Sequence, residues 1–199
     1  MKIVLIGANG TIGKAVVKEL EEHQLIEVGF SEDEYQVDIE DRNSLTKLFD
    51  KIGKVDAIIS TTGVAIFATV EELSYDQVKL SVNSKLIGNI NVFQMGQHYV
   101  NDGGSITLTS GILTQKPMYG GSAPSLVNAA LDSFAKATAF ELGDKLRINT
   151  VSPHFVKETM IMMGLDTEGG ISAADTAKAY SYAVNSDVTG QAIDVADHV

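Results

Sequence analysis

Three glycines near the start of the chain are spaced as a dinucleotide-binding turn requires. The stretch GANGTIG places Gly7, Gly10 and Gly13 after an apolar run and into a helical period. The first glycine allows a tight turn, the second lets the backbone approach a pyrophosphate, and the third lets helix and strand pack closely. The N–H groups of the helix then face the phosphates. The pattern predicts a dinucleotide site; the alternative is a tight strand-to-helix turn without a ligand.

The same stretch does not fit other phosphate or metal chemistry. Ala8 stands where a P-loop needs its first glycine, and Ala15 replaces the Ser or Thr that would hold magnesium. The chain has no cysteine, and its four histidines show no ligand-like spacing. We therefore expect no metal site.

The elements that must position this turn alternate between apolar runs and helical periods. Strand, helix and strand in repeated order predict one doubly wound parallel sheet of about seven strands, a Rossmann-like single domain over residues 1–199. The expected strands cover residues 2–6, 25–29, 35–39, 55–60, 105–110, 147–152 and 191–195. The expected helices cover residues 11–21, 44–52 with Ser44 as its cap, 70–99, 124–143 and 173–185.

Charge and hydropathy exclude some partners. The net charge of −11 repels phosphate backbones, so we expect no nucleic acid partner. No apolar run approaches the roughly 20 residues that span a bilayer, and the first apolar stretch is too short for a signal peptide. These features predict a cytoplasmic protein that does not enter membranes. The acidic cluster Glu32, Asp33 and Glu34 is expected to be a solvated loop.

Beyond the glycine turn, the chain resembles the short-chain dehydrogenase/reductase family over nearly its whole length. GANGTIG is similar to the glycine motif of that family, and VDAIISTTG to its Asn-Asn-Ala-Gly strand and turn, with Ser60, Thr61 and Thr62 in place of the first three residues and Gly63 last. LSYDQVKLSVNSKLIG resembles the stretch that presents the active-site asparagine, here Asn83. LRINTVSPHFVKETM resembles the strand and Pro-Gly turn that meet the nicotinamide, and VTGQAIDV resembles the last strand.

This resemblance implies a set of cofactor and catalytic residues. Ser110 fits the serine that steadies the substrate oxygen, and Asp38 fits the aspartate beside the adenine. The cofactor residues that it implies are Gly7, Asn9, Gly10, Thr11, Ile12, Gly13, Ser31, Asp38, Ser60, Thr61, Thr62, Gly63, Asn128, Pro153, Val156 and Thr159.

The proton-transfer pair of the family is replaced. Family chemistry uses a tyrosine phenol, whose pKa of about 10 must fall toward operating pH, with a lysine four residues later. Counting back from Phe134 and Glu141 puts Pro124 on the tyrosine and Asn128 on the lysine. Tyr119 and His154 are substitute donors near the expected nicotinamide. The alternatives are that Tyr119 only covers the cleft and that His154 is an exposed turn residue.

Two functions fit these residues. The first is an NAD(P)-dependent oxidoreductase with a substituted active site, acting on a small carbonyl or alcohol substrate. The second is a cofactor-binding sensor or structural subunit without turnover. The apolar run from Met160 to Met163, in a short lid near residues 155–171, could face an apolar substrate or pack in the core.

Cofactor type and assembly remain open at this level. The second strand ends without the acidic residue that favours NAD or the arginine that favours NADP. Glu32 and Asp33 oppose a 2′-phosphate, whereas Ser31 could bind one. The helical stretches 70–99 and 124–143 carry more apolar residues than one buried face needs, which predicts a homodimer or homotetramer; the alternative is deep burial in a monomer.

Overall fold

A parallel sheet forms the centre of the computed structural model, which describes residues 1–31 and 34–199. The sheet has seven strands in the order β3-β2-β1-β4-β5-β6-β7, and every pairing is parallel. This topology confirms the predicted fold class. The strands are β1 (Lys2–Ile6), β2 (Gln24–Gly29), β3 (Tyr35–Gln36), β4 (Val55–Ser60), β5 (Val100–Thr109), β6 (Arg147–Ser152) and β7 (Ala192–Asp194).

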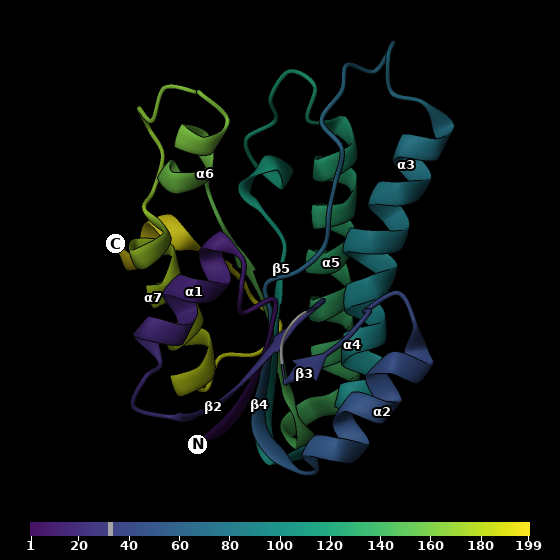
Figure 1. Ribbon diagram of the computed structural model, residues 1–199, viewed down its shortest axis with the longest axis vertical. Helices are drawn as coiled ribbons and strands as arrows, with labels where there is room; N and C mark the ends of the chain where they lie inside the picture. The colour runs from purple at the N-terminus through teal and green to yellow at the C-terminus, as the bar shows by residue number, and fades with distance from the viewer. Residues whose placement is uncertain (32–33) are drawn as a thin grey trace.

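Helices cover both faces of the sheet, with α1 and α7 on one side and α2, α4 and α5 on the other (Figure 1). The α-helices are α1 (Thr11–Glu19), α2 (Arg42–Ile52), α3 (Tyr75–Ser81), α4 (Gly88–Gly96), α5 (Ser122–Leu142), α6 (Lys157–Met162) and α7 (Ala173–Asn185). A π-helix, η1 (Val82–Ile87), joins α3 to α4, and short 3-10 turns cover Ile112–Thr114 (η2), Gly143–Lys145 (η3) and Val195–His198 (η4). None of the helices in the described residues is both long and apolar enough to cross a bilayer.

The helix starts differ from the sequence prediction at α2 and α3. The expected cap Ser44 is wrong: Asp41 caps α2 by accepting from the N–H of Asn43 at 2.8 Å, while the Ser44 hydroxyl accepts from the N–H of Asp38. The stretch expected as one helix from residue 70 begins at Tyr75, because Ser74 forms a capping box with Gln77. It is then interrupted by the π-helix.

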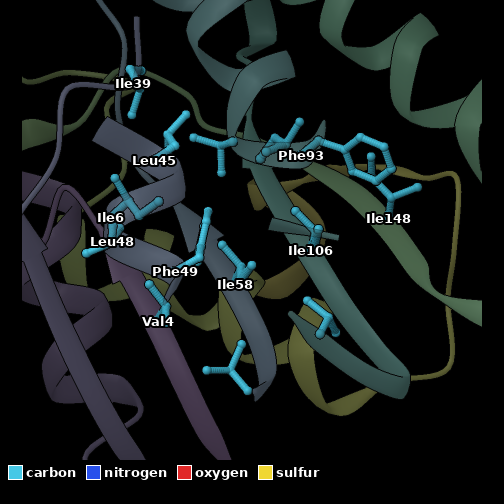
Figure 2. Close-up of a cluster of buried hydrophobic side chains, with 14 of the residues drawn as sticks. Val4, Ile6, Ile39, Leu45, Leu48, Phe49, Ile58, Phe93, Ile106 and Ile148 are labelled. Carbon is cyan, nitrogen blue, oxygen red and sulfur yellow. The ribbon is translucent and has the colours of Figure 1, made fainter. Parts of the chain in front are cut away.

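Two hydrophobic cores sandwich the sheet. One contains Leu45, Phe49 and Phe93 between the sheet and the helices α2, α4 and α5 (Figure 2). The other lies under α1 and α7. Consecutive residues of β4 serve different cores: Ile58 belongs to the first and Ile59 to the second, and both are fully buried. This explains why the VDAIIS run shows almost no polar alternation.

Loops from several strands gather at the carboxyl edge of the sheet. Two isolated bridges tie them together: Ala68 pairs with Gly121, and Val156 pairs with Ile171. The strand order changes direction between β1 and β4, with β2 and β3 on one side and β5 to β7 on the other. Open parallel sheets bind ligands in the crevice at such a switch point.

Candidate functional site

A crevice of about 450 Å³ lies at this switch point. It joins the turn after β1, the end of β2, the segment after β3 and the turn after β4. The residues that line it are Ile6, Gly7, Asn9, Gly10, Gly29, Phe30, Val37, Asp38, Ile39, Glu40, Thr61, Thr62, Gly63, Val64 and Ser84. Seven of the sequence-predicted cofactor residues are therefore brought together: Gly7, Asn9, Gly10, Asp38, Thr61, Thr62 and Gly63.

The glycine turn is shaped as the sequence predicts. Gly7 has φ of 90°, and a β-carbon there would lie 2.7 Å from both Thr61 Oγ1 and Thr62 Cγ2. A β-carbon on Gly13 would lie 2.0 Å from the carbonyl oxygen of Gly7, so α1 packs directly on the turn. Gly10 is the N-cap of α1 and makes no side-chain cap. The first N–H groups of α1 are thus available for a phosphate, as this chemistry requires.

The far end of the crevice carries the exposed carboxylate of Asp38. The end of β2 carries no acidic residue. Asp38 accepts from the N–H of Glu40 at 2.9 Å, which fixes its side chain. Phe30, the residue after β2, is 77% exposed. Ser31 is exposed and is not among the lining residues. Glu32 and Asp33, named as opposing a 2′-phosphate and as part of the acidic loop, lie outside the described residues.

Other predicted cofactor residues lie around the crevice rather than in its wall. Ser60 is buried beneath it, donates to Asn89 Oδ1 at 2.7 Å and shares a hydrogen bond with Thr62. Ile12 and Gly13 lie in the first turn of α1, and Thr11 lines a separate hollow against α6. On the other side of the sheet edge, Pro153 accepts from the N–H of Ile112, Val156 is the N-cap of α6, and Thr159 lies within α6.

The end of the sheet predicted to be catalytic is formed where β5 meets α5. Ser110 follows β5, is buried, and donates to the carbonyl of Val151 at 3.3 Å. Pro124 and Asn128 are both buried in the first two turns of α5. The Asn128 Nδ2 lies 2.6 Å from where a β-carbon on Gly111 would be, so the amide packs against the turn after Ser110. Among the described residues, its Oδ1 has no hydrogen-bond partner.

The three other predicted catalytic residues are not joined to Ser110 by any hydrogen bond in the described chain. Asn83 lies in the π-helix with its side chain exposed. Tyr119 is 87% exposed at the tip of the loop after β5. His154 Nε2 lies 2.8 Å from Asp194 Oδ1 at the end of β7, so the expectation of a merely exposed turn residue does not hold. Their catalytic roles stay predictions.

Sequence reasoning missed a polar cluster beside Ser110. Asp132, one turn after Asn128 on α5, accepts from Thr150 Oγ1 at 2.6 Å. Burial raises the pKa of Asp132, while the hydroxyls of Ser110, Thr150 and Thr114 and the charge of Lys85 oppose that rise. Burial also lowers the pKa of Lys85 to about 8, against the attraction of Asp132. No local sequence signal marked Lys85 or Asp132, because polar residues stand one turn before and after each of them.

Comparisons with known proteins decide the family. A family model described as enoyl-(acyl carrier protein) reductase matches residues 1–196. A solved small-chain dehydrogenase in complex with NADPH is 30% identical, covers 98% of this chain and 95% of its own, and superposes with a TM-score of 0.85. The chain belongs to the short-chain dehydrogenase/reductase family. As a member of it, the chain uses NAD or NADP, and the glycine turn and crevice fit such a dinucleotide.

Other proteins similar to this chain are either about as long as it or considerably longer. The protein lin1944 from Listeria innocua is 39% identical over 98% of this chain and 99% of its own, with a TM-score of 0.93. The bifunctional ribulose 5-phosphate reductase/CDP-ribitol pyrophosphorylase Bcs1 of Haemophilus influenzae is 29% identical over 97% of this chain but only 42% of its own. The chain spans about half the length of the curated relatives it matches. Their individual substrates are therefore not transferred to it.

Proposed function

We propose that this family member is an NAD(P)-dependent oxidoreductase that interconverts a small carbonyl compound and its alcohol through a substituted active site. One observation carries the proposal: the crevice with the glycine turn runs from Asp38 to Gly63, and the buried cluster around Ser110 lies beyond β4 on the neighbouring strand β5. When bound, the cofactor would supply or accept the hydride. The protein then has to place the substrate and manage one proton.

The residues at the crevice support binding of the whole dinucleotide. The free N–H groups of α1 suit the pyrophosphate, Asp38 suits the adenine end, and the Thr61–Gly63 turn suits the segment between them. We propose NADP(H) as the preferred form. The residue after β2 is Phe30 rather than an acid that would hold a free ribose, and the 30% identical relative is described with NADPH.

Pro124 and Asn128 support the substituted site. Both are buried on the first turns of α5, and neither carries a group that can give or take a proton at neutral pH. The second candidate function, a cofactor-binding protein without turnover, rests on the same two residues. The enzyme is preferred because loss of a general acid costs typically about 10²–10⁴-fold and need not abolish activity.

The rim of the catalytic end supports an apolar substrate. The rings of Phe67, after β4, and Phe155, after β6, lie 6.3 Å apart. Met118 in the loop after β5 is also exposed, as are Met162 and Met163 of the segment proposed as a lid. Exposure of this methionine run argues against core packing, the alternative left open by the sequence. Flexible, polarizable side chains of this kind adapt to apolar ligands.

The experiment that tests the proposal combines binding and turnover. NAD(H) and NADP(H) are titrated calorimetrically, and cofactor oxidation or reduction is followed against a panel of aliphatic and aromatic carbonyls and alcohols. Binding with turnover supports the enzyme. Tight binding with no turnover across the panel supports the sensor instead.

We also propose a homodimer formed through the outer surfaces of α3, α4 and α5. Phe140 on α5 is 91% exposed, and Leu126 on the same helix and Leu80 and Ile87 on the facing segment are exposed as well. Val127 and Leu131, in contrast, are fully buried, so only part of the apolar surface of α5 is needed by the monomer core. Burying the remaining side chains between two copies would follow from the hydrophobic effect.

A further inference from the structure

Lys85 is placed against the crevice by an unusual stretch of helix. It lies in the π-helix Val82–Ile87, between α3 and α4. π-Helical turns are rare in proteins, and those that occur are often found at functional sites. The extra residue in the turn changes which side chains face inward. Here Asn83 is exposed, whereas a β-carbon on Gly63 would lie 2.8 Å from the Lys85 Cα and 3.0 Å from its Cδ. The stem of Lys85 therefore passes directly over the last residue of the turn after β4.

The π-helix that carries Lys85 packs against α5, where the polar cluster lies. Among the described residues, Asp132 is the one charged group that acts on the Lys85 ammonium. The same carboxylate accepts from Thr150 Oγ1 at 2.6 Å, and the Ser110 and Thr114 hydroxyls act to lower its pKa. Lys85 on the π-helix and Ser110 after β5 thus both act to lower the pKa of Asp132 on α5.

The neighbouring position of α5 lacks a charge. Asn128 is one turn before Asp132, and the resemblance to the family places a lysine there. The Asn128 amide is buried against Gly111. It cannot supply an ammonium, and its buried Oδ1 finds no partner within the described residues. A cation is therefore missing from this position of α5 and present, on the facing helical segment, at Lys85.

We infer that Lys85 is the proton donor of this active site, delivered from the π-helix that packs against α5. In carbonyl reduction, the reduced cofactor, when bound, would supply the hydride for the new C–H bond, and the carbonyl π electrons would move to oxygen. The Lys85 ammonium gives the proton that forms the O–H bond and becomes a neutral amine, which regains a proton from solvent. The alcohol and oxidised cofactor are the products, and charge and atoms balance.

This inference rests on the proposed function, and it gives a role to the lowered pKa of Lys85 and to the charge of Asp132. A lysine suits general acid work only when its pKa is brought toward operating pH, and burial lowers the pKa of Lys85 to about 8. Asp132 opposes that drop, so it favours the protonated ammonium at neutral pH. Asp132 is thus a positioning residue.

The test uses four variants of the full chain with NADPH and a carbonyl that the wild type reduces. Lys85→Met removes the charge, Lys85→Arg keeps the charge but cannot release a proton, and Asp132→Asn removes the positioning charge. Lys79→Met, on an exposed lysine of α3, is the matched control. Thermal melting and NADPH titration establish that each variant is folded and binds.

The expected result is a loss of about 10²-fold or more in kcat for both Lys85 variants, with NADPH binding retained. The kcat of the wild type should fall as pH rises through the pKa of Lys85, because the protonated form is required. In Asp132→Asn this fall should begin at lower pH, because the carboxylate no longer favours the ammonium. Full activity of Lys85→Arg with an unchanged pH profile would overturn the inference, as would an equal loss in Lys79→Met.

A second experiment tests the position of Lys85 even if the protein has no enzymatic activity. If the wild type binds NADPH but reduces nothing, NMR of ¹³Cε-labelled lysine tests whether Lys85 lies beside the bound cofactor. The resonance missing from the Lys85→Met spectrum is assigned to Lys85. Addition of NADPH should then shift the Lys85 resonance and its titration. A Lys85 resonance unmoved by saturating NADPH would overturn the placement itself.

Discussion

A β-carbon added to Gly13 would lie 2.0 Å from the carbonyl oxygen of Gly7, closer than any real contact allows. By contrast, a β-carbon on Gly10 would lie 3.4 Å from the same oxygen, which is an ordinary contact. Gly10 also has φ of −72°, a value open to any residue. Packing therefore requires a glycine at Gly13 but not at Gly10, where we expect the glycine to allow the approach of a phosphate.

Gly13→Ala should consequently lower both stability and cofactor binding, with about 1–3 kcal/mol lost from the free energy of unfolding. Gly10→Ala should leave stability nearly unchanged and weaken NADP(H) binding, since its methyl group would occupy the approach of the pyrophosphate. Urea unfolding and calorimetry on both variants separate the effects. Equal behaviour of the two variants would show that the turn is only a packing device.

Introducing a tyrosine and a lysine tests whether Pro124 and Asn128 occupy the positions of the family's catalytic tyrosine and lysine. In a Lys85→Met background, Pro124→Tyr with Asn128→Lys should place a phenol beside an ammonium that lowers its pKa. Carbonyl reduction should rise by about 10²-fold over that background. Asn128→Lys alone should raise it little. Steady-state kinetics on the three variants provide the comparison.

A different outcome would relocate the donor. If Tyr119→Phe or His154→Ala abolishes turnover in the native protein while Lys85→Met does not, the proton comes from one of those residues. The exposure of Tyr119 and the pairing of His154 with Asp194 lead us to expect nearly full activity in both variants.

The pH dependence of stability reports on Lys85 without a substrate. Its pKa in the folded protein is about 8, below the value of about 10.4 in an unfolded chain. Between these values the unfolded chain binds more protons than the folded protein, so the free energy of unfolding rises with pH. The stability of the wild type relative to Lys85→Met should therefore increase from about pH 7 to about pH 10.5. Urea unfolding across this range that gives a constant difference would contradict a buried ammonium.

Assembly is tested by light scattering with a matched variant. The wild type should scatter as a species of at least twice the 21.2 kDa chain mass. Phe140→Ser should shift it toward the monomer, because the exposed ring would no longer bury surface between copies. A wild type that remains at the chain mass across a concentration series contradicts the dimer.

Periodicity predicted most of the fold because its signals are local. The apolar run VDAIIS shows that β4 is buried on both faces, and RINTVS matches β6 residue for residue. The cap of α2 was missed because Asp41 and Ser44 are both good capping residues and only tertiary contacts choose between them.

The site was predictable where it depends on backbone shape and less so where it depends on side chains from distant segments. Gly7 and Gly63 follow from turn geometry beside two adjacent strands. The electrostatic effect of Asp132 on Lys85 depends on a π-helix, which no periodicity indicates, and on the packing of that segment against α5. A lysine between Ser84 and Leu86 in sequence carries no sign of the acidic residue that acts on it in space.

Calorimetric titration of the wild type with NADPH, NADP, NADH and NAD tests the account most directly, since every proposal depends on the crevice between β1 and β4. We predict saturable one-site binding, tighter for the NADP(H) pair and weakened in Gly10→Ala. No detectable binding of any of the four at millimolar concentration would contradict a dinucleotide site in this crevice, and with it both the enzyme and the sensor.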